Sequence, residues 1–225
     1  MSLLLGHLDK GLDGLLELSD KVTEIKSSTF CNSTKLKGEL NIPSNVNCIE
    51  MNAFYGCGEF EGELIIPDSV TNIGSFAFAF CGGFSSLKLS KNAKIVADHS
   101  FYFCSGLKGE LVIYNSTQII GCEAFYNCSK LSDLIINCQF IQLDDRAFKM
   151  TSLSTVKYNG KSEPFCGLDV FPVDLNVETL SYYRSDEFCG IHVDKDDEGK
   201  SINSKVKAII ITLGSFLGAA VIIII

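Results

Sequence analysis

The sequence predicts an α/β-type repeat solenoid, with short parallel strands on a concave face and irregular turns on the convex side, followed by a C-terminal transmembrane helix. Two observations lead to this architecture. Phenylalanine recurs at a nearly constant step through most of the 225 residues, and the chain ends in a long uncharged apolar run. With 46% hydrophobic residues, a chain of this length can bury a sizeable core.

Six phenylalanines set the repeat register, and the steps between them differ by no more than one position: Phe30, Phe54, Phe78, Phe101, Phe125 and Phe148. A leucine precedes each of them at one fixed distance: Leu16, Leu40, Leu64, Leu87, Leu111 and Leu134. A second aliphatic residue follows two positions after the leucine, and a third follows nine positions after it. A period in this range with a leucine-x-isoleucine core is typical of leucine-rich solenoids.

Each predicted coil has a simple physical reading. In a strand, alternate side chains share a face, so the leucine and the aliphatic residue two positions later point into the same core. Proline after the strand, as in Pro43-Ser44 and Pro67-Asp68, turns the chain back. The return side then buries the third aliphatic residue and the phenylalanine. One coil cannot bury its own face, so neighbouring coils must stack.

The ten cysteines fall into classes once the repeat is known. Four occur three positions after a repeat phenylalanine: Cys57, Cys81, Cys104 and Cys128. A column at one repeat position predicts inward thiols that pack and bond weakly to backbone, with pairing between adjacent coils as the alternative. Cys166 and Cys189 lie beyond the last repeat and are a candidate disulfide if the compartment is oxidising.

The repeat resembles a known family. The stretch from Gly62 through Ile66-Pro67-Asp68-Ser69-Val70 to Ala77-Phe78 and Cys81 is similar to the repeat of BspA-like leucine-rich proteins, also called the Treponema pallidum type. Residues 169–193 are similar to the cap before the membrane anchor of trichomonad-type members. The resemblance implies a surface protein used in adhesion or in contact with host or matrix, with its repeats outside the cell.

The ends of the chain complete the expected organisation. Residues 208–225 carry no charge, and as a helix they would reach about 27 Å, nearly a hydrocarbon core. A single span, a tail anchor and a lipid-anchor signal all fit this run. Met1–Leu8 lacks a basic signal-peptide region, and Lys205 and Lys207 favour a cytosolic repeat domain by the positive-inside rule. We expect five segments: a remnant at 1–11, the solenoid at 12–153, a cap at 154–193, an acidic linker at 194–207 and the anchor at 208–225.

Several activities are not expected. The net charge of −8 and the sequence pI near 4.9 argue against nucleic acid as a partner. The three histidines are far apart in sequence, and no hydrolase, phosphate-loop or metal-binding motif is present. The acidic stretch from Asp194 has Lys205 where a calcium loop needs a bidentate glutamate. We therefore expect no enzyme activity, no cofactor and no metal.

The predicted strand face offers a candidate binding surface. The residue before each repeat leucine is often acidic, as at Glu39, Glu63, Glu110 and Asp133, and the residue after it is aliphatic at Ile65, Val112 and Ile135. Aliphatic side chains beside carboxylates indicate a contact patch for a protein with basic and apolar features, although β-propensity alone also explains them. Asn32 and Asn115 open glycosylation triplets, and the triplet at Asn127 is a weaker candidate because it includes a ladder cysteine.

Two functions follow from these features. The first is a membrane-anchored surface protein that binds a host, matrix or other surface protein, or mediates adhesion, through its sheet face. The alternative is a tail-anchored intracellular scaffold that recruits protein partners through the same face. Glycan on Asn32 or Asn115, or an oxidised Cys166–Cys189 pair, would favour the first. Fully reduced cysteines without glycan would favour the second.

Overall fold

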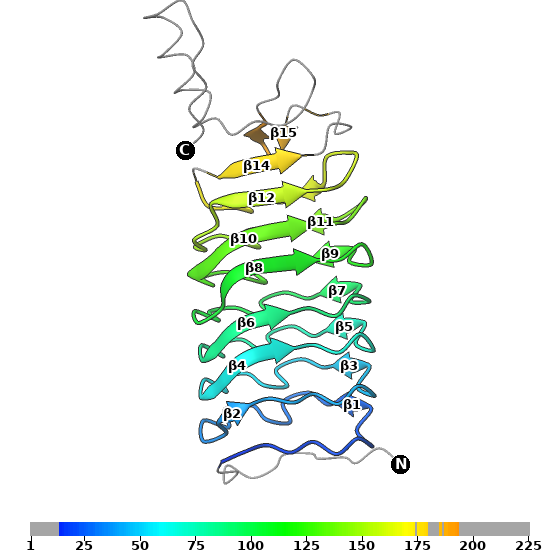
Figure 1. Ribbon diagram of the computed structural model, residues 1–225, viewed down its shortest axis with the longest axis vertical. Coiled ribbons are helices and arrows are strands. Elements are labelled where there is room, and N and C mark those ends of the chain that lie inside the picture. Colours follow the sequence, from blue (N-terminus) through cyan, green and yellow to red (C-terminus); the bar gives the residue numbers. More distant parts are fainter. Residues whose placement is uncertain (1–13, 174, 180–184, 186, 194–225) are drawn as a thin grey trace, which may run out of the picture.

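The computed structural model describes residues 14–173, 175–179, 185 and 187–193, which form one long column of stacked coils (Figure 1). Within these residues there are strands and turns but no helix. The leucine-rich solenoid is confirmed, and the α/β label is wrong for the described chain, which is all β.

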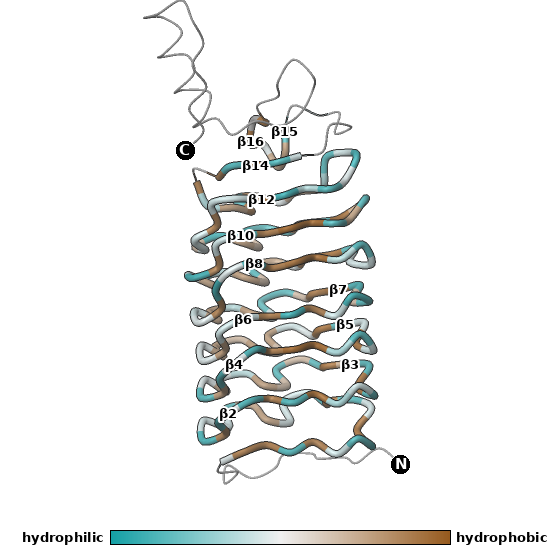
Figure 2. Tube along the Cα trace, in the orientation of Figure 1, coloured by the Kyte–Doolittle hydropathy of each residue, from teal (hydrophilic) through white to brown (hydrophobic). Residues whose placement is uncertain are grey.

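One side of the column carries parallel strands at the leucine positions predicted from the sequence: β2 (Gly38–Glu39), β4 (Phe60–Ile65), β6 (Phe84–Lys88), β8 (Lys108–Ile113) and β10 (Lys130–Ile136). Two further strands, β12 (Thr155–Tyr158) and β14 (Asn176–Thr179), continue this side inside the stretch expected to be the cap. Together these strands form two ladders, β2-β4-β6 and β8-β10-β12-β14. We refer to this side as the leucine face. Inward leucines and isoleucines alternate there with outward residues, which are polar in some coils and aliphatic at Ile65, Val112 and Ile135. Hydrophobic and hydrophilic stretches therefore both occur along the coils (Figure 2).

The return side is a second parallel sheet and not the irregular surface expected from the sequence. Its seven strands have two residues each: β1 (Glu24–Ile25), β3 (Cys48–Ile49), β5 (Asn72–Ile73), β7 (Ile95–Val96), β9 (Ile119–Ile120), β11 (Gln142–Leu143) and β13 (Phe165–Cys166). The second residue of the first six strands is the aliphatic residue nine positions after the repeat leucine, and it is buried. The stacked coils therefore form backbone hydrogen-bond ladders on the return side as well as on the leucine face.

A tight turn carries each repeat phenylalanine and excludes a helix. Two positions before the phenylalanine, the backbone is left-handed in every coil, with φ between 52° and 59°: Ser28, Asn52, Phe76, His99, Glu123, Arg146 and Asp169. A right-handed helix cannot pass through such a residue. The turns also bond between coils, since the N–H of Phe78 donates to the carbonyl of Ser100 at 2.8 Å.

The core centres on one continuous stack of aromatic rings. Adjacent centroids are 5.1 to 5.5 Å apart and the planes lie within 13° of each other: Phe30, Phe54, Phe78, Phe101, Phe125, Phe148 and Phe171. Phe171 follows the last predicted coil, so residues 155–173, with strands β12 and β13, add another coil inside the stretch expected to be the cap. The stack ties every coil to its neighbours by offset ring contacts.

The coils occur in two lengths that differ by a single position, and the difference has a local cause. Longer coils carry a left-handed glycine two positions before the leucine, as at Gly62 and Gly109, with φ of 78° and 79°. Shorter coils lack it and instead place Ser85 or Ser132 there, whose hydroxyl donates to the carbonyl of that glycine in the preceding coil. The leucine-face sheet is interrupted between β6 and β8, where a shorter coil is followed by a longer one.

A hairpin closes the C-terminal end of the described column. Strands β15 (Glu187–Phe188) and β16 (Ile191–His192) pair antiparallel, and Phe188 packs on Tyr158 and Phe171 with centroids 5.0 and 5.6 Å apart. No helix long and apolar enough to cross a membrane occurs in the described ranges. The expected segments 1–11, 194–207 and 208–225 all lie outside them.

Candidate protein-binding face

The acidic column of the leucine face is present but is not continuous. Glu39, Glu63 and Glu110 are exposed, and Asp133 is half-buried. Parallel pairing places Glu110 beside Asp133, whereas Glu63 lies beside Ser86. No ion pair in the described coils neutralises Glu39, Glu63 or Glu110. Adjacent carboxylates without a basic partner leave a local negative potential at this face.

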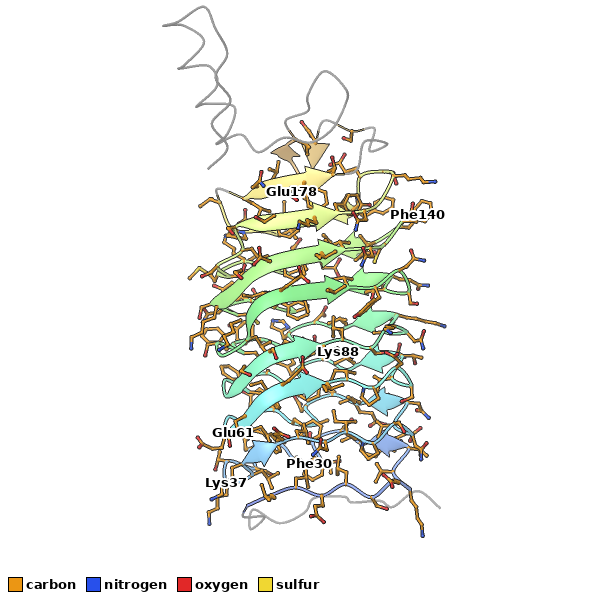
Figure 3. The ribbon with its side chains drawn as sticks, viewed as in Figure 1. Phe30, Lys37, Glu61, Lys88, Phe140 and Glu178 are labelled. Carbon is orange, nitrogen blue, oxygen red and sulfur yellow. A yellow bond between two sulfur atoms is a disulfide. The ribbon has the colours of Figure 1, made fainter. Side chains whose placement is uncertain are left out.

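One acidic residue of this face was missed at the sequence level. Glu61 pairs with Glu39, so coils two and three together place three exposed carboxylates side by side, Glu39, Glu61 and Glu63 (Figure 3 labels Glu61). Gly62, which lies between two of these glutamates, has a left-handed backbone with a φ of 78°. A glycine flanked by glutamates, Glu61-Gly62-Glu63, was the available signal.

The aliphatic column is shorter than expected. Val112 pairs with Ile135, and both are half-buried. Ile65 is 47% exposed but pairs with Lys88, which Figure 3 labels, so a cation lies beside it in the next coil. The structure therefore brings together Glu110, Val112, Asp133 and Ile135 as one patch, and it leaves Glu39, Glu63 and Ile65 in a second patch beyond the break between β6 and β8.

The thiol ladder is confirmed. Cys57, Cys81, Cys104 and Cys128 are fully buried and unpaired. Each Sγ donates to the carbonyl of a phenylalanine in the preceding coil, at 2.9 to 3.2 Å: Phe30, Phe54, Phe78 and Phe101. Burial raises the pKa of the Cys57 thiol to about 12 and holds the pKa of the other three above the ordinary value. These cysteines act as small apolar side chains that also satisfy a carbonyl.

Alkylation should separate the free cysteines by burial. Iodoacetamide at pH 8 should label the half-buried Cys31, Cys48 and Cys122, and spare the ladder. A thiol with a pKa of about 12 is only about one part in ten thousand thiolate at that pH, and the thiolate is the nucleophile. Peptide mass spectrometry would read the labelled positions, with a urea-unfolded sample as the control in which all eight react. Labelling of Cys104 in the folded protein would contradict the ladder.

The structure joins Cys166 to Cys189 in a disulfide, with Cα atoms 5.4 Å apart. Cys166 ends strand β13 and Cys189 lies in the turn of the β15–β16 hairpin. The bond therefore fastens the closing hairpin to the last coil across a sequence separation of 23. By constraining the unfolded chain, a loop of this length is expected to stabilise the native state by about 3 kcal/mol.

A second exterior feature was not expected from the sequence. Seven rings from coils two to five form a connected cluster on the turn side: Tyr55, Phe76, Phe80, His99, Tyr102, Phe103 and Tyr126. Its spine is Tyr55, Phe80, Tyr102 and Tyr126, with successive centroids 5.4 to 5.5 Å apart. Tyr55, Tyr102 and Tyr126 each directly follow a repeat phenylalanine, but coil three has Ala79 at that position. The ring of Phe80, one position later, takes the place of the missing tyrosine, so the aromatic pattern was not visible in the sequence.

A short polar chain continues from this cluster. His99 stacks on Phe76 at 4.4 Å, its Nε2 lies 3.2 Å from Glu123, and Glu123 pairs with Arg146 at 2.7 Å. A catalytic site would need a nucleophile or substrate cavity beside the imidazole, and the contacts of His99 are to aromatic rings and this one carboxylate. The described residues also contain no group of three or more His, Cys, Asp or Glu side chains placed to hold a metal ion.

The glycosylation triplets lie at accessible turns. Asn32 and Asn115 are exposed, and Asn127 is half-buried beside its ladder cysteine. The Thr117 hydroxyl in the second triplet is buried and donates to the carbonyl of Ala93 at 2.9 Å. Glycosylation at Asn32 and Asn115 stays a prediction.

Stacked coils with two parallel sheets and a phenylalanine core define a β-solenoid of the leucine-rich repeat class. The family described as "BspA type Leucine rich repeat region" matches this sequence in six copies, over residues 15–109 and 49–167. The chain belongs to this family. A search of curated protein sequences finds no match.

Two solved structures illustrate the similarity. The leucine-rich repeat protein of T. pallidum is 24% identical, with 80% of this chain and 81% of that chain aligned at a TM-score of 0.62. A leucine rich cell surface protein of Faecalibacterium prausnitzii is 19% identical, with 74% of this chain and 60% of that chain aligned at a TM-score of 0.47. The similarity to the T. pallidum protein supports the leucine-rich solenoid fold described above.

Proposed function

We propose that this protein is a non-enzymatic, membrane-anchored surface protein that binds a protein of the host, the matrix or another cell surface through its leucine face. The observation that carries the proposal is the patch of Glu110, Val112, Asp133 and Ile135. Among the described residues, two carboxylates in register lack a basic partner there and border two aliphatic side chains in register. Such a mixture suits a ligand with basic and apolar groups.

Anchorage in this proposal comes from residues 208–225, with residues 194–207 as the linker. The run contains no charged residue, and only a helix would satisfy its backbone groups in lipid. The alternative is a tail-anchored intracellular scaffold. Lys205 and Lys207 beside the run favour it. The Cys166–Cys189 disulfide supports the surface location instead. External protease applied to intact cells separates the two, because cleavage of the repeats requires a surface location.

Charge reversal tests the face. The double substitution Glu63→Lys with Glu110→Lys should weaken retention of the full-length protein on surfaces coated with matrix proteins by at least about tenfold, or about 1.4 kcal/mol. Its matched control reverses Glu24 and Glu163, which lie on and beside the seven-stranded sheet and give the same change in net charge. Equal losses in both double variants would reject the leucine face as the binding surface.

A further inference from the structure

The last two coils expose apolar side chains to an unusual degree. Phe140, Phe165, Leu168 and Val173 are 79%, 76%, 75% and 87% exposed. We refer to these four residues as the C-terminal rim. Phe140 lies at an outer corner near the C-terminal end of the column (Figure 3), in the loop before β11, and β11 pairs with the strand β13 that contains Phe165.

The solenoid itself does not require these side chains. Phe165 occupies the outward position held by Gln142 in the preceding coil, with which it is in register. Leu168 stands one repeat after Asp145, and it takes the place of that aspartate in the turn. The hairpin β15–β16 covers the end of the core through Phe188 and leaves the rim uncovered. Outward positions thus become apolar where the described column ends.

The chain that follows indicates what covers the rim. Beyond Val193 the sequence ends in the uncharged run 208–225, and only the short segment 194–207 separates the described column from that run. Whatever its conformation, a segment of this length spans at most about 50 Å. An anchored chain therefore keeps the rim close to the membrane, where a second, weak contact becomes intramolecular and gains from a high effective concentration.

The charges of the last coil favour a neutral lipid surface over an anionic one. Asp169 is paired with Lys149 at 2.6 Å, and the exposed Lys161 is followed by the exposed Glu163. The described part of this coil has no basic excess to attract anionic headgroups. We infer that the C-terminal rim inserts into the interface of a zwitterionic bilayer and seats the last coil on the membrane. This inference rests on the anchorage proposed above.

The sequence contains no tryptophan, so single tryptophans can report on the contact. Three variants of the full chain would be reconstituted into phosphatidylcholine vesicles with plain or brominated acyl chains. Phe165→Trp reports on the rim, Phe216→Trp reports on the terminal run, and Phe80→Trp is the control, an exposed aromatic position in the middle of the column.

Side chains in the interface lie within about 5–10 Å of the acyl boundary, so brominated lipid should quench Phe165→Trp emission by roughly half and leave Phe80→Trp unchanged. Quenching of Phe216→Trp without quenching of Phe165→Trp would overturn the rim contact and leave the anchor standing. A blue-shifted but unquenched Phe165→Trp would overturn it too, because the chain itself would then cover the rim. If neither Phe165→Trp nor Phe216→Trp is quenched and the vesicles do not retain the protein, the anchor and the rim contact are both overturned.

Discussion

Phe101→Ala should lower the free energy of unfolding by about 4 kcal/mol. The Phe101 ring is fully buried between Phe78 and Phe125, with centroids 5.4 and 5.1 Å away, so truncation opens a cavity in the middle of the stack. The backbone on both sides is held by inter-coil hydrogen bonds and cannot collapse into the space. Urea unfolding followed by circular dichroism would measure the loss.

The matched control is Phe103→Ala, in the same coil and with the same atoms removed. Its ring is only half-buried and belongs to the outer aromatic cluster, so we expect a loss of about 1 kcal/mol. Coils contact mainly their neighbours, and Phe30 stacks on one ring of the described stack where Phe101 stacks on two. Phe30→Ala should therefore lower the free energy of unfolding by less than Phe101→Ala. Equal losses for Phe101→Ala and Phe103→Ala would show that the inner stack has no special role.

The inner half of this fold could be predicted from the sequence because it repeats. Buried positions must carry similar side chains in every coil, and the leucine, isoleucine and phenylalanine columns therefore recur at one period. The return strands were missed for a physical reason: a two-residue strand has only one inward side chain, and so it leaves no alternating pattern. Its partner residues, such as Asn72 and Gln142, are polar and unremarkable alone.

The surface was harder to predict, since outward positions need not repeat. The outer aromatic cluster draws on three repeat positions and uses Phe80 where its neighbours use Tyr55 and Tyr102. The acidic column was found from its repeat position, but the pairing of Glu39 with Glu61 and the register shift that skips Ser85 are properties of the backbone pairing. Such shifts follow from backbone conformation at single residues.

Glycine is needed at certain turns because the backbones of adjacent coils lie too close there for a side chain to fit between them. A Cβ added at Gly106 would lie 2.1 Å from the carbonyl oxygen of Gly82 and 2.5 Å from that of Phe84, both in the preceding coil. A Cβ at Gly109, three positions later, would meet nothing within 4 Å, although φ there is +79°. The two glycines in one coil are thus needed for different reasons, close approach at the first and left-handed backbone at the second.

Gly106→Ala should therefore lower the free energy of unfolding by about 3 kcal/mol, because two backbone carbonyls cannot move aside without parting the coils. Gly109→Ala should cost about 1 kcal/mol, the conformational penalty alone, and Gly109→Asn should cost less, since asparagine tolerates the left-handed region. Urea unfolding of the three variants gives the order. If Gly109→Ala is the more damaging, the close approach of coils at Gly82 is not a constraint on this solenoid.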